Sequence, residues 1–254
     1  MTTATPLLEA AAGLHGAQHL VVFTGAGVSK ESGLATFRDA DGAWAKVDPQ
    51  RYASPQGFRK HPREVWQWYV WRRQEMQKAP PNPAHLTIAA CERLFPTVTV
   101  VTQNIDGLHQ AAGSQRVLEL HGSIHRFKCS ANCCGAPTLV PTPALTEEEP
   151  CPCPHCGALI RPAVVWFGES LPPDVWEAAA QAALSCDAML VVGTSGLVEP
   201  AASLPRYAAH YGAFVVEVNL EPTPLTPLAA VHLPGLAGEV LPALLEAYQS
   251  IAGN

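Results

Sequence analysis

Six of the eight cysteines in this chain lie in two short segments, 129–134 and 151–156. Cys153 and Cys156 form a C-x-x-C pair, and the upstream segment can supply a second pair of thiolates. Two cysteine pairs from two turns form a closed tetrahedral zinc site, in which no coordination position is open to a substrate. Zinc is favoured over disulfides because residues 1–12 lack the features of a secretory signal. The sequence therefore predicts one structural Zn²⁺ ion and a catalytic group elsewhere.

The choice of ligands is open in each segment, because Cys151 competes with Cys153 and Cys133 competes with Cys134. A glycine follows Cys134, as one follows Cys156, and such a glycine is typical of the turn in a zinc knuckle. We therefore favour Cys134 over Cys133. The predicted ligands are Cys129, Cys134, Cys153 and Cys156.

Four continuous apolar runs predict strands that helices cover on both faces, since strands with one solvated face alternate instead. Helical patterns lie between them, notably at 174–184 and 201–210. This alternation predicts an α/β fold with a Rossmann-like, doubly wound parallel sheet. The four predicted strands are 20–24, 98–102, 188–192 and 214–218.

Each of these strands ends in glycine or polar residues, and the carboxyl ends of parallel strands form the ligand-binding edge of such sheets. Gly25-Ala26-Gly27 permits close approach of a pyrophosphate, although the full G-x-G-x-x-G spacing is absent. Asn219 and Glu221 follow the last strand and can bind ribose hydroxyls or simply cap the chain. The four loops together predict a nucleotide site.

His121 is the nearest candidate for a catalytic group. It follows an expected strand at 117–120 and precedes the cysteine-rich module. An imidazole titrates near neutral pH and can remove a proton from a weakly acidic hydroxyl. The chain has ten histidines, so the case for His121 depends on its position between the nucleotide loops and the cysteines.

The order and spacing of these motifs resemble the sirtuins, which are NAD-dependent protein lysine deacylases. The resemblance runs from about Leu20 to the C-terminus, and the four-cysteine module is in its usual place. Ala35 departs from the pattern, since the family commonly has proline there, and this affects loop stiffness. The matching motifs are Gly25–Gly33, Thr36–Arg38, Gln103–Asp106, His121-Gly122, Gly193–Ser195 and Asn219–Glu221.

The resemblance implies that NAD is the cosubstrate and that His121 activates one of its ribose hydroxyls. The acyl group of lysine then passes to ADP-ribose, which yields nicotinamide and O-acyl-ADP-ribose. Asn104 and Asp106 are expected to hold the ribose and the carboxamide. The implied NAD-binding residues are Gly25, Ala26, Gly27, Ser29, Glu31, Thr36, Phe37, Arg38, Trp44, Gln103, Asn104, Ile105, Asp106, Gly193, Thr194, Ser195, Asn219, Glu221 and Ala237.

The acyl-lysine peptide is expected to lie as an added strand between the segments 166–169 and 196–198, a mode of binding driven by the backbone. The resemblance extends to the residues along these two edges. The implied peptide-binding residues are Val165, Phe167, Gly168, Glu169 and Val198.

The preferred acyl group is indicated by two residues of an expected helix at 61–78. Tyr69 and Arg72 share a face of this helix. A phenol and a guanidinium suit a carboxylate, whereas the alternative is a solvated arginine such as Arg73. Tyr69 and Arg72 resemble the Tyr-x-x-Arg element of sirtuins that prefer acidic acyl groups, and Ala43 resembles the small residue that widens their acyl pocket. We therefore expect succinyl- and malonyl-lysine to be preferred over acetyl-lysine.

Other functions are less well supported. A net charge of −6 argues against non-specific nucleic-acid binding, and no apolar run is long enough to cross a membrane. A non-catalytic adaptor is disfavoured because His121 and Asn104 are both present. We expect a cytoplasmic, monomeric enzyme, with predominant deacetylation or mono-ADP-ribosyl transfer as the alternatives.

The motifs also predict how the chain is divided. Cys91 and Cys186 stand alone in apolar contexts and are expected in the core. The expected domains are a Rossmann-like NAD-binding domain of residues 1–34, 84–122 and 164–254, and a small helical and zinc-binding domain of residues 35–83 and 123–163.

Overall fold

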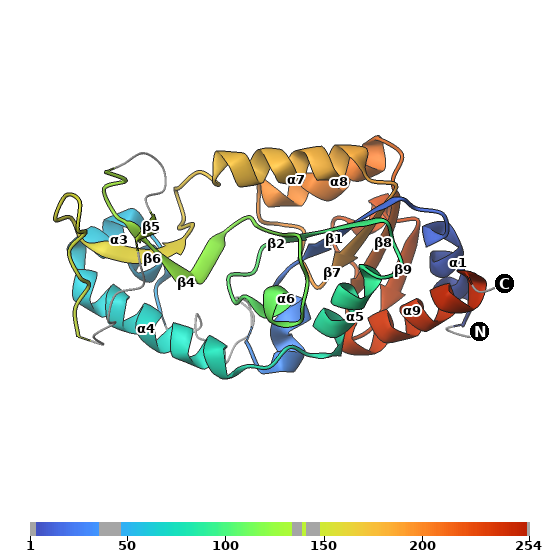
Figure 1. The fold of residues 1–254 in the computed structure, drawn as a ribbon, viewed down its shortest axis with the longest axis horizontal. Coiled ribbons are helices and arrows are strands. Elements are labelled where there is room, and N and C mark those ends of the chain that lie inside the picture. The colour runs from blue at the N-terminus through green and yellow to red at the C-terminus, as the bar shows by residue number, and fades with distance from the viewer. Residues whose placement is uncertain (1–3, 36–46, 134–138, 141–147, 253–254) are drawn as a thin grey trace.

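A parallel sheet of six strands forms the larger part of the computed structural model, which describes residues 4–35, 47–133, 139–140 and 148–252 (Figure 1). The strand order is β3-β2-β1-β7-β8-β9, so the chain winds outward from β1 in one direction and from β7 in the other. This doubly wound order confirms the predicted fold class. The strands are β1 (His19–Thr24), β2 (Thr97–Thr102), β3 (Val117–Glu119), β7 (Ala188–Val192), β8 (Phe214–Asn219) and β9 (Val231–Pro234).

Helices cover both faces of this sheet, which explains why its strands are largely apolar. Leu20 and Val22 of β1 pack in a cluster with α1, α5 and α9, whereas Val21 and Phe23 pack in another with α7 and α8 (Figure 1). Successive side chains of a strand face opposite sides. The helices are α1 (Ala4–Leu14), α5 (Pro83–Cys91), α6 (Leu108–Ala111), α7 (Pro173–Ser185), α8 (Leu204–His210) and α9 (Ala237–Ala252), with short 3₁₀ helices at Ala26–Ser32, Ala201–Ser203 and Thr226–Leu228.

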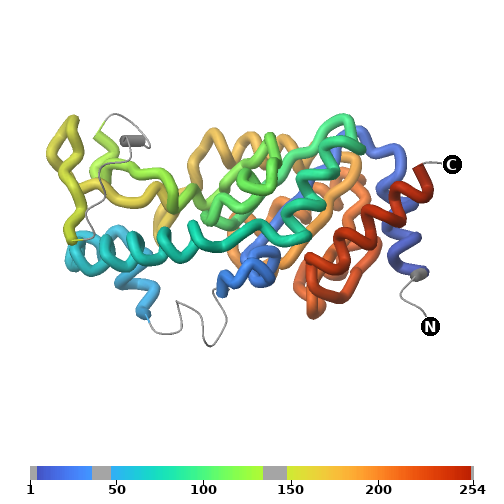
Figure 2. The backbone as a smooth tube through the Cα atoms, turned by 60° about the horizontal axis from the view of Figure 1, so that its bottom comes forward, coloured from blue at the N-terminus to red at the C-terminus, as the bar shows by residue number. Residues whose placement is uncertain are grey.

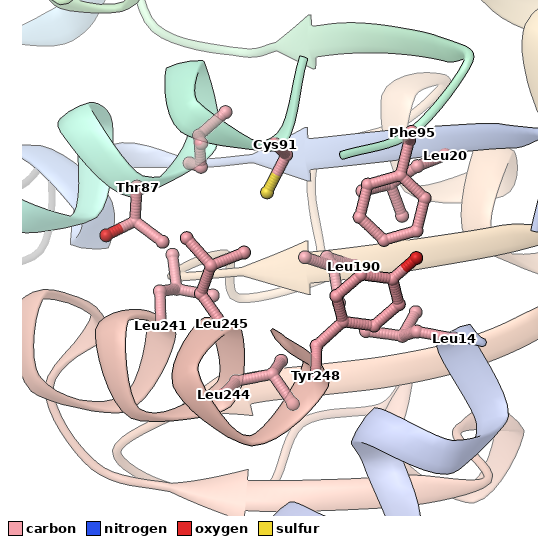
Figure 3. A pocket seen from close by; sticks show the side chains of 11 residues that line it. Leu14, Leu20, Thr87, Cys91, Phe95, Leu190, Leu241, Leu244, Leu245 and Tyr248 are labelled. Carbon is pink, nitrogen blue, oxygen red and sulfur yellow. The ribbon is translucent and has the colours of Figure 1, made fainter. Parts of the chain in front are cut away.

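A small apolar cavity lies between α5, α9 and the sheet (Figure 3). Apart from Thr87, Cys91 and the Tyr248 hydroxyl, its lining is hydrocarbon. Burial raises the pKa of the Cys91 thiol to about 12, so this cysteine is a protonated core residue, as predicted. None of the predicted site residues lines this cavity. The predicted nucleotide site lies instead at the carboxyl ends of the strands.

The smaller part of the molecule joins two segments that are far apart in the chain (Figures 1 and 2). Trp66 and Val70 of α4 pack against Phe127 and Ile160 of a three-stranded antiparallel sheet with the order β5-β4-β6. Among the described residues, no helix combines the length and apolar character needed to cross a membrane. The elements of this part are α2 (Pro49–Tyr52), α3 (Pro55–Lys60), α4 (Pro62–Lys78), β4 (Gly122–Cys129), β5 (Leu139–Val140) and β6 (Ile160–Val164).

Candidate active site

The loops after β1 and β7 meet where the strand order reverses, which is the usual ligand site of an open α/β sheet. The Gly27 N–H donates to the Gly193 carbonyl at 2.8 Å, and a Cβ on Gly27 would lie 2.7 Å from that oxygen. Gly193 has φ 58°, and a Cβ there would lie 2.5 Å from the Val28 nitrogen. Only glycines allow this backbone-to-backbone contact. The resulting cradle of bare backbone fits the pyrophosphate of a dinucleotide.

Three buried polar side chains lie beside this cradle. Asn104 Nδ2 donates to the Gly25 carbonyl and to Ser29 Oγ, both at 3.1 Å, and Ser29 Oγ donates to Asp106 Oδ2 at 2.8 Å. The Leu108 N–H donates to the other Asp106 oxygen at 2.9 Å. These bonds hold Asn104 and Asp106 in place before any ligand arrives, so the site is organised in advance.

His121 lies at the carboxyl end of β3, and its ring is tied to the loop after β2. Nδ1 is 2.8 Å from the Gln103 carbonyl, which can only accept a hydrogen bond. Nδ1 therefore carries the proton in the neutral ring, and Nε2 is left with a lone pair. Burial lowers the pKa of His121 below its usual value, although the bond to the carbonyl opposes this shift. The ring is thus a neutral base at physiological pH.

The next residue fixes the direction of the chain after His121. Gly122 has φ 73°, and a Cβ on it would lie 2.0 Å from the Ala163 carbonyl oxygen. The His121 carbonyl accepts from the Val165 N–H at 2.9 Å, so the histidine is also paired to the chain that leaves β6. A side chain at position 122 would separate these segments, and His121 would move with them.

Other residues of the rim hold the loops together. Asn219 Nδ2 donates to the Thr194 carbonyl at 2.7 Å, and Gln103 Nε2 donates to Thr194 Oγ1 at 2.8 Å. Glu31 accepts from the Gly238 N–H at 2.7 Å, next to Ala237 at the start of α9. Their expected contacts with NAD remain predictions, as do those of Ile105, Ser195 and the exposed Glu221. Thr36, Phe37, Arg38, Ala43 and Trp44 lie outside the described residues.

A layer of buried polar side chains, which no sequence pattern indicated, lies beneath this site. His109 Nε2 lies 2.9 Å from Thr24 Oγ1, which donates to Thr102 Oγ1 at 2.8 Å. Thr102 Oγ1 in turn accepts from the Asn104 N–H at 3.0 Å, and the His85 ring lies 4.9 Å from that of His109. Threonines at strand ends are ordinary β residues, and only the register of β1 and β2 brings these two together.

The second cluster of reactive side chains consists of cysteines. The Cys129 and Cys156 sulfurs are 3.6 Å apart, and those of Cys133 and Cys153 are 3.7 Å apart; all four lie within 4.8 Å of one another. Tetrahedral zinc with bonds of ~2.3 Å requires sulfurs separated by about 3.8 Å, so the cluster fits this ion. Burial opposes ionisation of Cys129, but N–H groups of Cys133 and Ala131 lower the pKa of its thiol to about 6.

The cluster contains Cys133, whereas we predicted Cys134, which lies outside the described residues. Asn132 has φ 50°, a left-handed conformation that asparagine tolerates, and its N–H donates to the Cys129 carbonyl at 3.3 Å. This turn returns Cys133 to Cys129. Cys151 is not among the four clustered cysteines of the described chain.

Tyr69 and Arg72 are both buried, with 3% and 9% of their surfaces exposed. The Trp166 indole N–H donates to Tyr69 Oη at 2.7 Å. Within the described part of the chain, the Arg72 guanidinium forms no hydrogen bond or ion pair. Arg73 instead lies over the Phe127 ring at 5.9 Å. The alternative of a solvated arginine therefore does not apply to Arg72.

The two edges expected to hold a peptide carry exposed apolar side chains. Phe167 is 47% exposed and Val198 is 44% exposed. Glu169 differs, because its carboxylate accepts from Arg161 and from the Trp166 backbone N–H at 2.9 Å. Glu169 therefore organises its own loop, while its contact with a peptide stays a prediction, as do those of Val165 and Gly168.

A dinucleotide cradle, a half-buried neutral histidine and a four-cysteine metal centre together define an NAD-dependent enzyme with a structural zinc module. The Sir2 family matches residues 25–200, and the chain belongs to this family. It is 50% identical over 233 residues to NAD-dependent protein deacylase 2 of Pyrobaculum aerophilum, covering 92% of each chain. The cosubstrate NAD and one structural zinc ion follow from this membership and from the two clusters.

Solved structures agree with this placement. A Sir2 homolog in complex with NAD superposes with a TM-score of 0.86 at 43% identity, covering 96% of this chain and 94% of that one. Sir2Af2 bound to a myristoylated histone peptide gives a TM-score of 0.74 at 36% identity, covering 98% of this chain and 99% of that one. The chain is thus similar along almost its whole length to Sir2 proteins.

Proposed function

We propose that this enzyme uses NAD to remove acidic acyl groups, succinyl and malonyl, from lysine side chains of proteins. The observation that carries the proposal is Arg72, a buried guanidinium that makes no hydrogen bond or ion pair with the described residues, although the Asp106 and Glu75 carboxylates interact with it electrostatically. A buried charge is costly unless it is paired. An acyl group that ends in a carboxylate supplies the missing partner.

Comparison with the other buried arginine supports this interpretation. Arg161 has a side chain only 4% exposed, and it is paired with Glu169. Burial lowers the pKa of Arg72, and the nearby Tyr69 and Asp106 only partly oppose this effect. Of the two buried arginines among the described residues, Arg72 is thus the one without an ion pair, and a guanidinium can bind a carboxylate bidentately.

The position of Arg72 relative to the reaction also fits. The electrostatic interaction of Arg72 with Asp106 means that it lies near the polar residues beside the nucleotide cradle. The myristoyl group on the peptide bound by Sir2Af2 is neutral, and a neutral acyl chain forms no ion pair with a guanidinium. An acyl chain that ends at the Arg72 guanidinium is matched in charge when it carries a terminal carboxylate.

The residues of the site account for the steps of deacylation. NAD supplies the ribose that receives the acyl group. His121 takes a proton at Nε2, because Nδ1 is held protonated by the Gln103 carbonyl. Asn104 and Asp106 orient the ribose and the nicotinamide carboxamide from the loop after β2. Tyr69 and Arg72 bind the distal carboxylate of the acyl group.

The test compares one peptide sequence carrying succinyl-, malonyl- or acetyl-lysine, with NAD consumption and O-acyl-ADP-ribose followed by mass spectrometry. We expect the wild type to have a higher kcat/KM for the acidic groups. Arg72→Met should lower kcat/KM for the succinyl peptide by roughly 10- to 100-fold, since a charged hydrogen bond contributes about 1.5–3 kcal/mol.

The matched control is Arg73→Met, which removes the neighbouring guanidinium and should leave the succinyl-to-acetyl ratio unchanged. Arg72→Met should also leave acetyl-lysine turnover within about twofold. Equal losses for both acyl groups would mean that Arg72 only packs the small domain. A wild type that prefers acetyl-lysine would refute the proposal directly.

A further inference from the structure

Trp166 makes a hydrogen bond whose direction is unambiguous. An indole N–H can only donate, so the Tyr69 oxygen is the acceptor of the 2.7 Å bond between them. Burial raises the pKa of Tyr69 well above its usual range, so the phenol keeps its proton. With one side of the oxygen occupied by Trp166, the Tyr69 hydroxyl hydrogen must be donated elsewhere.

No acceptor for that hydrogen is found among the described residues. A buried donor without an acceptor is destabilising, which is why such groups are rare. Arg72, three positions further along α4, is the neighbouring group that also makes no hydrogen bond or ion pair among the described residues. The Tyr69 hydroxyl and Arg72 therefore present two donors to the same ligand.

The indole itself is held from several sides. The Arg161 guanidinium lies 3.8 Å from the centre of the Trp166 ring, a close cation–π contact, and the Phe58 ring lies 5.4 Å away. Glu169 pairs with Arg161 and accepts from the Trp166 backbone N–H at 2.9 Å. One carboxylate thus fixes both the backbone of Trp166 and the cation that covers its ring.

We infer that Trp166 is a positioning residue for acyl specificity: its N–H sets the Tyr69 hydroxyl so that the phenol donates to the distal carboxylate of an acidic acyl group. The inference rests on the proposed function. Because Trp166 is itself 3% exposed, it acts through Tyr69. The ion pair of Arg161 and Glu169 holds the Trp166 ring and backbone in this arrangement.

The experiment is a double-mutant cycle with Trp166→Phe, which removes the N–H and keeps an aromatic ring, and Tyr69→Phe. Kinetics are measured with succinyl- and acetyl-lysine on one peptide sequence. Trp166→Phe should raise KM for the succinyl peptide roughly three- to tenfold, the effect of one hydrogen bond. The values of kcat for both peptides and of KM for the acetyl peptide should stay within about twofold of wild type.

The double variant should bind the succinyl peptide no more weakly than Tyr69→Phe alone, because Trp166 acts only through the hydroxyl. Equal losses for both acyl groups, or losses that multiply in the double variant, would overturn the inference. If Trp166→Phe does not fold, site-specific replacement by benzothienylalanine, in which sulfur replaces the N–H, makes the same comparison in an indole-shaped ring.

The two proposals fail in distinguishable ways. A wild type without a preference for succinyl-lysine refutes the proposed function whatever Trp166 does. A wild type that prefers succinyl-lysine, loses this preference in Arg72→Met and keeps it in Trp166→Phe refutes the role of Trp166 alone.

Discussion

Replacement of His121 by alanine should abolish deacylation while the protein still binds NAD. The structure supports this separation because His121 bonds to the Gln103 carbonyl, whereas the nucleotide cradle is made by the glycines after β1 and β7. Loss of a general base typically lowers the rate ~10²–10⁴-fold. We expect that loss in kcat, with the dissociation constant for NAD within about threefold of wild type.

The pH dependence of the wild type provides an independent measure of the same group. Burial lowers the pKa of His121 from 6.5, so the basic form persists to lower pH than for an exposed histidine. At pH 7.5 about nine tenths or more of the rings are neutral. The acid limb of log kcat/KM should therefore have its midpoint below 6.5, and the rate should fall as the pH drops through that midpoint.

The assay is single-turnover deacylation between pH 5 and 9, with NAD binding measured by calorimetry on each variant. The control is His210→Ala, which removes an exposed ring at the end of α8 and should leave both the rate and the midpoint unchanged. A His121→Ala enzyme with near wild-type turnover would remove His121 from the mechanism. An acid limb centred above 6.5 would contradict the lowered pKa of His121.

Two further predictions concern the stability of the fold. Removal of zinc by a chelator, or Cys156→Ala, should lower the melting temperature and the activity together. The chelated protein should recover both on addition of Zn²⁺. An apoprotein that stays folded and fully active would contradict a structural role of the ion. Burial lowers the pKa of His109 to about 3, so its contribution to stability is present above pH 6.5 and is lost as the pH falls toward 3. Protonation of His109 in the unfolded chain should make the free energy of unfolding in urea roughly 2 kcal/mol lower at pH 5 than at pH 7.5. His109→Asn should reduce this dependence on pH. If the unfolding free energy of His109→Asn depends on pH as strongly as that of the wild type, His109 does not titrate in this way.

The fold could be predicted from local sequence because the signals that specify it are local. Strands buried on both faces are apolar at nearly every position, so most of β1 and all of β7 are visible as continuous apolar runs. Gly27 and Gly193 stand where two loops touch through their backbones, and no other residue fits there. For the same reason the nucleotide-binding edge and the position of His121 were accessible before the structure.

The sequence could not decide which of two neighbouring residues with the same chemistry joins a site. Cys133 and Cys134 have the same chemistry, and the left-handed turn at Asn132 decides that Cys133 joins the cluster. Asn219 was expected to bind a ribose hydroxyl and Glu31 to bind NAD; the structure adds that Asn219 donates to the Thr194 carbonyl and that Glu31 accepts from the Gly238 N–H, which no local pattern indicates. The hydrogen-bond partner of a polar side chain depends on which other loop the packing places within about 3 Å of it.

The sequence by itself thus determined the doubly wound sheet, the metal-binding character of the cysteines and the tyrosine and arginine on one face of α4. Only the tertiary structure decided that Arg72 makes no hydrogen bond or ion pair in the described chain and that Tyr69 accepts from Trp166, 97 residues away. The physical reason is that periodicity and spacing describe a segment and its two faces. Burial and hydrogen-bond partners arise where separate segments pack, and the bond between Tyr69 of α4 and Trp166 in the chain that follows β6 forms at such a junction.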